Sequence, residues 1–252
     1  MKLNGKYALV TGSAQRIGRG IAFKLAEEGV NIIVHYSTSA DKSDETIQVL
    51  SDLGVETLKI QADLGDYNQI IEMFTNIEEN IGKLDLLVNN ASTFKAGSLL
   101  NTDIETWNTT MSVNLTAPLV CMQQAHRIMM NNVIESKLIV NISDIIGKQY
   151  WNKFTAHSVS KSALIHLTKL AAKEFSPSIR VNAIVPGLIL PPKNMSNTSK
   201  RWIEMEQNTP LKSSGNVSDI GRAVVYLAEN DYITGETITI DGGASLLDSS
   251  MI

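Results

Sequence analysis

The fold is decided by residues 6–29, "KYALVTGSAQRIGRGIAFKLAEEG". Residues 6–12 form a short apolar run, which predicts a strand buried on both faces. The apolar spacing over residues 17–29 then predicts a helix that ends at a glycine. Between them stand Gly12, Gly18 and Gly20, which let backbone N–H groups approach a pyrophosphate at the start of that helix. The stretch therefore predicts a first βα unit that binds a dinucleotide.

The same alternation continues to the end of the chain. Further strands are predicted over 30–36, 55–63, 83–91, 137–143, 179–187 and 236–243, and helices over 40–54, 66–82, 104–130 and 156–175. This order predicts an α/β protein, with a single-domain Rossmann fold over residues 1–252. We expect a doubly wound parallel seven-stranded sheet with helices on both faces.

One segment, residues 188–219, interrupts this alternation of strands and helices. It is polar, contains three prolines and follows the end of a predicted strand. A long connection at that position is typical of a loop that covers a binding site. We expect this lid segment to lie over a substrate within the single domain.

Composition excludes several classes of function. The net charge is −4 with no basic run, which disfavours a nucleic-acid partner. The only cysteine, Cys121, lies in an apolar run and predicts a buried structural thiol. Four histidines without metal-ligand spacing predict no metal site. The first residues contain no apolar segment long enough for a signal peptide or a membrane span, so we expect a cytoplasmic protein.

The second predicted strand indicates which dinucleotide is bound. It ends in "HYSTSA", without the acidic residue that would accept a ribose 2′-OH. Ser37, Thr38 and Ser39 follow it, and Arg16 stands in the glycine loop. Hydroxyls and a guanidinium suit a 2′-phosphate and favour NADP(H), although Arg16 could also be merely solvated.

Motifs along nearly the whole chain resemble the short-chain dehydrogenase/reductase family. "TGSAQRIG" is similar to its cofactor loop, "ADL" to its adenine contact, "NNA" to the motif after its fourth strand, and "PG" to its nicotinamide contact. The resemblance implies a cofactor site made of Gly12, Arg16, Ile17, Gly18, Ser37, Thr38, Ser39, Asp63, Leu64, Asn90, Ala91, Ser92, Lys161, Pro186, Gly187, Leu188 and Ile189.

The family's catalytic pattern is present in altered form. The resemblance implies a Tyr-x-x-x-Lys pair, a serine thirteen residues before the tyrosine, and a helix asparagine. Lys161 and Asn114 match, but His157 stands at the tyrosine position and Asp144 at the serine position. These four are the candidate catalytic residues, with Lys161 also implied to bind the nicotinamide ribose.

Several of these departures resemble the pteridine reductase and dihydromonapterin reductase branch of the family. That branch has an aspartate at the serine position, an arginine in the glycine loop, a second strand ending in His-Tyr, and "NNAS" followed by a phenylalanine. The resemblance implies a pterin site made of Ser92, Phe94, Asp144, His157 and, in the lid segment, Trp202.

The residues of this pterin site have defined chemical uses. Phe94 would hold the pterin parallel to the nicotinamide, and Asp144 would accept N–H groups of the aminopyrimidine or carry a proton. Lys161 would lower the pKa of His157 and Asp144 would raise it, which could leave the imidazole able to donate or accept a proton. Core packing for Phe94, a cap for Asp144 and a polar filler for His157 remain as structural alternatives.

Three functions are therefore open. The first is an NADPH-dependent pterin reductase, the second a 3-oxoacyl- or sugar-type carbonyl reductase, and the third a weakly active NADP(H)-binding protein that has lost its tyrosine. The family resemblance also implies a homotetramer, or a homodimer, packed through helices 103–131 and 155–175.

Overall fold

The computed structural model describes residues 1–131 and 136–247, and within them seven strands form one parallel sheet. The strands are β1 (Tyr7–Val10), β2 (Asn31–Tyr36), β3 (Thr57–Gln61), β4 (Leu86–Asn89), β5 (Lys137–Ile142), β6 (Ile179–Pro186) and β7 (Thr237–Ile240). Their order is β3-β2-β1-β4-β5-β6-β7. The predicted doubly wound sheet is confirmed, and its order reverses between β1 and β4, where such sheets bind ligands.

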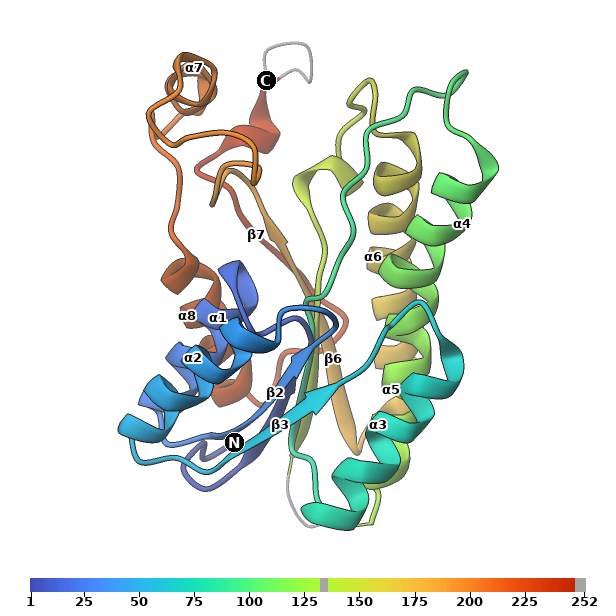
Figure 1. Ribbon diagram of the computed structural model, residues 1–252, viewed down its shortest axis with the longest axis vertical. Coiled ribbons are helices and arrows are strands. Elements are labelled where there is room, and N and C mark those ends of the chain that lie inside the picture. Colours follow the sequence, from blue (N-terminus) through green and yellow to red (C-terminus); the bar gives the residue numbers. More distant parts are fainter. Residues whose placement is uncertain (132–135, 248–252) are drawn as a thin grey trace.

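Helices cover both faces of the sheet, as Figure 1 shows. On one face lie α1 (Arg16–Glu27), α2 (Ala40–Asp52) and α8 (Val217–Glu229), and on the other lie α3 (Tyr67–Asn80), α4 (Ile104–Met111), α5 (Ala117–Met129) and α6 (Thr155–Phe175). Among the described residues, the two larger apolar cores lie on opposite faces, one between the sheet and α1, α2 and α8, the other between the sheet, α3, α5 and α6. Cys121 lies buried in the second core as a free thiol.

The predicted helix over 104–130 is interrupted, which the sequence pattern did not indicate. Between α4 and α5 the chain makes a π-helical turn, Ser112–Thr116, with Asn114 buried inside it. Pro118 stands at the start of α5 and has no N–H to donate to the carbonyl four residues earlier, that of Asn114. The regular ladder of helical hydrogen bonds is therefore broken where Asn114 turns inward.

The lid segment is more structured than its composition indicates. It contains a short helix, α7 (Lys200–Asn208), and its last residues, from Val217, are the first turn of α8. Neither helix was predicted. Figure 1 shows α7 beside the C-terminal end of the described chain, apart from the helices that flank the sheet. Among the described helices none is both long and apolar enough to cross a membrane.

Candidate active site

The glycine loop lies at the switch point of the sheet and requires glycine for steric reasons. Gly12 has a φ of +67°, and a Cβ there would lie 3.2 Å from the Cα of Ala91. A Cβ on Gly18 would overlap the carbonyl oxygen of Gly12. The side-chain amide of Asn90 donates to the carbonyl of Thr11 at 2.8 Å, and the N–H of Ala91 donates to the hydroxyl of Thr11. The loops after β1 and β4 are thus locked together.

The start of α1 is open to an anion. Its N-cap residue, Gln15, makes no side-chain capping bond, and the first turn contains no acidic residue. The N–H groups of that turn, those of Arg16, Ile17 and Gly18, have no partner within the helix and are oriented to bind a phosphate. This uncapped helix and the glycine cradle before it fit the pyrophosphate of a nicotinamide dinucleotide.

Arg16 adopts an unusual backbone conformation and contacts the lid segment. Its φ is +55°, in the left-handed region that residues with a side chain rarely adopt. Its guanidinium donates to the carbonyl of Pro191 at 2.8 Å. A contact between Arg16 and a 2′-phosphate remains a prediction.

The predicted 2′-phosphate region gains a cation that sequence reasoning missed. Ser37 and Thr38 are exposed, and Ser39 is the N-cap of α2 without a capping bond of its own. The side-chain amide nitrogen of Gln15 lies 3.4 Å from the hydroxyl of Ser39, and the ammonium of Lys42 donates to the side-chain oxygen of Gln15 at 3.0 Å. Lys42 lies in the first turn of α2, three residues after Ser39. Its place just after the three hydroxyl residues is the only feature of the sequence that could have indicated it.

The other predicted cofactor contacts lie at the same edge of the sheet. Asp63 is exposed after β3 and accepts from the N–H of Gly65, whereas Leu64 is buried. Pro186 ends β6, and Gly187 donates to the carbonyl of Ile240. The carbonyl of Leu188 accepts from Gly215 at the far end of the lid segment, and Ile189 is buried in the core.

The candidate catalytic residues meet where β5 ends against α6. His157 and Lys161 are both buried on α6, with 2% and 3% exposure. The carboxylate of Asp144 lies 3.4 Å from Nε2 of His157, and its other oxygen accepts from the N–H of Ile146 at 2.9 Å. Asp144 is therefore both a local cap and the partner of the imidazole. The structure brings the predicted histidine and aspartate together.

Lys161 is held apart from water. Its ammonium donates to the carbonyl of Ile142 at 2.8 Å, at the end of β5. Burial lowers the pKa of Lys161 from 10.5 to about 8, although the charge of Asp144 acts in the opposite direction. An amine with this pKa carries a positive charge at neutral pH while titrating within reach of ordinary assays.

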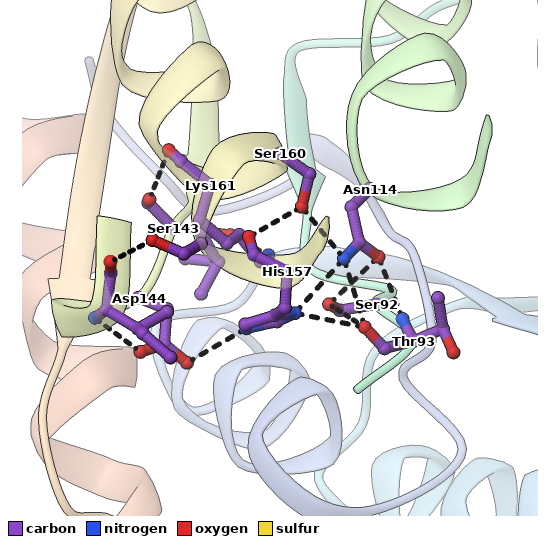
Figure 2. Close-up of polar contacts among 11 residues, drawn as sticks. Ser92, Thr93, Asn114, Ser143, Asp144, His157, Ser160 and Lys161 are labelled. Carbon is purple, nitrogen blue, oxygen red and sulfur yellow. Dashed lines mark hydrogen bonds and ion pairs between the residues drawn. The ribbon is translucent and has the colours of Figure 1, made fainter. Parts of the chain in front are cut away.

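Asn114 binds the other side of the imidazole. Its amide nitrogen lies 3.2 Å from Nδ1 of His157 and 3.0 Å from the carbonyl oxygen of Thr93, and its oxygen accepts from the N–H of Thr93 at 2.8 Å. The hydroxyl of Ser92 lies 3.1 Å from the same oxygen. Figure 2 shows Asp144 on one side of the His157 ring and Asn114, Ser92 and Thr93 on the other.

This arrangement gives His157 partners in two protonation states. As an imidazolium it can donate from Nδ1 to the carbonyl of Thr93, 3.1 Å away, and from Nε2 to Asp144. As a neutral ring protonated at Nε2 it keeps Asp144 and can accept at Nδ1 from Asn114. The ring can therefore gain or lose the Nδ1 proton without leaving a buried nitrogen unpaired.

Two aromatic rings border this cluster. Phe94 is 51% exposed, which is inconsistent with simple core packing. Its ring makes an edge contact with the ring of His157, with the two centroids 4.7 Å apart. The ring of Phe154, a residue not predicted from the sequence, also lies with its centroid 4.7 Å from that of Phe94. Trp202 is buried within the lid segment, where its indole N–H donates to Glu206 at 2.9 Å. A substrate contact for Trp202 remains a prediction.

Among residues 1–131 and 136–247, no group of three or more His, Cys, Asp or Glu side chains is placed to hold a metal ion. The polar groups gathered at the site are instead amide, hydroxyl, imidazole, ammonium and carboxylate groups. They suit the binding of a nucleotide and the transfer of protons.

Comparisons with known proteins agree with this geometry. Residues 12–245 match the family model described as "Enoyl-(Acyl carrier protein) reductase". The 3-oxoacyl-[acyl-carrier-protein] reductase FabG of Staphylococcus epidermidis is 35% identical over 94% of this chain and 98% of its own.

Solved structures give the same result. The FolM alternative dihydrofolate reductase 1 of Brucella canis, complexed with NADP, is 31% identical with a TM-score of 0.90 over 98% of this chain and 96% of its own. A variant of a Serratia marcescens short-chain dehydrogenase/reductase is 30% identical with a TM-score of 0.91 over 97% of this chain and 100% of its own. With the glycine loop, the asparagine of the π-helical turn and the buried lysine of α6 in place, this chain belongs to the short-chain dehydrogenase/reductase family of oxidoreductases.

Proposed function

We propose that this chain is an NADPH-dependent reductase of a pterin or dihydropterin. The observation that carries the proposal is a carboxylate, that of Asp144, paired with the imidazole of His157 beside the half-exposed ring of Phe94. Reducing such a ring requires hydride on one face, which the nicotinamide supplies when the cofactor is bound, and a proton at a ring nitrogen.

Asp144 favours a pterin over a carbonyl substrate for an electrostatic reason. Carbonyl reduction develops negative charge on oxygen, which needs hydrogen-bond donors and is destabilised by a neighbouring carboxylate. An aminopyrimidine instead presents N–H donors, which a carboxylate accepts well. Phe94 offers an exposed aromatic surface on which a flat bicyclic ring can stack.

Asp144 and His157 divide the work of proton delivery. The side chain of Asp144 is 33% exposed and that of His157 is 2% exposed, so Asp144 is the member of the pair that reaches a substrate. A proton passes from Nε2 of the imidazolium to the Asp144 carboxylate and from there to the ring nitrogen. The neutral imidazole left behind keeps its Nδ1–H on the carbonyl of Thr93, and its Nε2, now without a proton, regains one from solvent through the more exposed Asp144.

The preference for NADPH rests on the region after β2. This region has hydroxyls at residues 37–39, an uncapped α2 and the nearby ammonium of Lys42, and it has no acidic residue at the end of the strand. A 2′-phosphate would be bound there and a 2′-hydroxyl would not be specifically recognised. The Brucella canis FolM structure was solved with NADP.

A second candidate is a reductase of 3-oxoacyl thioesters. The similarity to FabG, at 35% identity, favours it. In that case His157 would protonate the developing alkoxide in place of a tyrosine. Asp144 argues against this candidate, because its charge lies beside the position of that oxygen.

The test is NADPH oxidation by the purified protein, with dihydrobiopterin and an acetoacetyl thioester assayed in parallel. The proposal predicts turnover with the pterin, its loss in Asp144→Ala, and no gain with the thioester. Turnover of the thioester alone would make the chain a carbonyl reductase. If neither substrate reacts while NADPH still binds, and His157→Tyr produces pterin turnover, the chain is a binding protein whose site lacks only its acid.

We further propose that the protein assembles through α5 and α6 as a homotetramer or homodimer. Leu119, Val159 and Leu170 lie on these helices with 38%, 42% and 52% exposure. Light scattering coupled to gel filtration tests this, and Leu170→Glu should shift the population toward monomer if α6 lies in the interface.

A further inference from the structure

A buried histidine under the glycine loop has no part in the chemistry described so far. His35, in β2, is 1% exposed and lies three strands across the sheet from β5, the strand that leads to Asp144. Its Nδ1 lies 2.9 Å from the backbone nitrogen of Gly12, and its Nε2 lies 3.1 Å from the carbonyl oxygen of Ala62. One ring therefore joins the loop after β1 to the residue that follows β3.

The two contacts fix the protonation state of the ring. The backbone N–H of Gly12 can only donate, so Nδ1 must carry a lone pair. The carbonyl of Ala62 can only accept, so Nε2 must carry the proton. Burial lowers the pKa of His35 to about 4, against the opposing influences of the Ala62 carbonyl and Asp63, so the neutral ring persists at physiological pH. Only the neutral Nε2–H tautomer satisfies both partners.

The backbone strengthens the same junction. The N–H of Ser13 donates to the carbonyl of His35 at 3.0 Å, and the N–H of His35 donates to the hydroxyl of Ser13 at 3.1 Å. The Gly12 N–H is thus directed into the protein, toward the imidazole, while the N–H groups at the start of α1 remain uncapped. The turn cannot rotate about Gly12 without losing the bond to Nδ1.

We propose that His35 is a positioning residue for the cofactor, a neutral hydrogen-bond acceptor that holds the glycine loop in the conformation that binds the pyrophosphate. Its ring contacts the loop at the N–H of Gly12, so it acts on cofactor binding through Gly12. This inference rests on the proposed NADPH cofactor and is independent of whether the substrate is a pterin.

Three substitutions separate this role from simple space filling. His35→Asn places a side-chain oxygen close to the position of Nδ1 and keeps an acceptor for the Gly12 N–H. His35→Phe keeps a ring of similar size and removes both polar contacts. Lys137→Met is the control, because it disrupts a buried ion pair with Asp85 at the opposite edge of the sheet, outside the cofactor site.

The primary readout is the dissociation constant of NADPH, measured by its fluorescence, with thermal unfolding of the cofactor-free protein alongside. We expect His35→Phe to weaken binding by about tenfold or more, and His35→Asn to stay within about threefold of the original chain. Lys137→Met should lower thermal stability without weakening NADPH binding. Equal binding by the Phe variant, or equally poor binding by the Asn and Phe variants, would overturn the proposal.

A second measurement, of the tautomer of His35, does not depend on cofactor binding. The nitrogen-15 spectrum of histidine-labelled protein near pH 7, assigned with the Asn variant, reports the tautomer of His35 directly. We expect a neutral ring protonated at Nε2, and a cationic ring or one protonated at Nδ1 would overturn the proposal. If the original chain fails to bind NADPH while the tautomer is as expected, the proposed cofactor is wrong and the junction at Gly12 stands.

Discussion

The buried ammonium of Lys161 makes the stability of the protein depend on pH. The pKa of this group is about 8 in the folded chain, against 10.5 for an ordinary lysine. Between these two values the unfolded chain binds more protons at this amine than the folded chain does. The free energy of unfolding must therefore rise with pH between about pH 8 and pH 10.5. Below about pH 8 Lys161 is protonated in both the folded and the unfolded chain, so it makes no contribution to the pH dependence there.

The size of the effect follows from the difference between the two pKa values. The difference, 10.5 minus about 8, is about 2.5 units, which corresponds to about 3 kcal/mol over the whole window. The local slope cannot exceed about 1.4 kcal/mol per pH unit for a single group. Because Asp144 raises the pKa of Lys161, its removal in Asp144→Asn should move the start of the rise to lower pH.

The assay is chemical denaturation at a series of pH values, comparing the original chain with Lys161→Met. Their difference in unfolding free energy isolates this amine from other groups, including Tyr7, whose pKa is raised to about 12 by Glu56. Lys169→Met, an exposed position on the same helix, is the control and should show no such rise. A difference that stays flat across the window would refute the reasoning, since Lys161 would then titrate as it does in the unfolded chain.

Other substitutions test the cofactor loop, the far edge of the sheet and the lid segment. Gly18→Ala should weaken NADPH binding by about tenfold or more in a fluorescence titration, because its Cβ overlaps a loop carbonyl; unchanged binding would show that the loop can shift. Lys137→Met should lower the unfolding free energy by about 3 kcal/mol in urea, because it leaves Asp85 buried without this partner, and a loss below about 1 kcal/mol would contradict that account. Trp202→Phe should remove the bond to Glu206 and speed proteolytic cleavage within residues 188–219, with cleavage at the original rate speaking against an indole anchor.

Local patterns in the sequence were sufficient to predict much of the fold. Strands such as β5 and β6 are buried along their whole length and appear in the sequence as continuous apolar runs. The family resemblance grouped Asp144, His157 and Lys161, and in the structure Asp144 lies beside His157 while its charge acts on Lys161. Their roles in catalysis stay predictions.

The remaining features depend on contacts between distant segments. His35 looks like one more residue of a strand until Gly12 and Ala62 are placed on its two nitrogens. Helix α8 was missed, although its cap, an Asn216–Asp219 capping box, was present in the sequence and could have marked its start. The polar composition of residues 188–219 predicted a loop, and no helix was predicted after it.

The π-helical turn Ser112–Thr116 has a consequence for how this chain tolerates change in length. Such a turn holds one residue more than a regular helix needs, so a single-residue deletion there would leave a continuous helix whose hydrogen-bond ladder lacks the N–H at Pro118. That shorter helix would rotate Asn114 away from Thr93 and His157, removing their shared amide while the rest of the fold persisted. At this position the number of residues in the turn matters to the site as much as the identity of the side chain at 114.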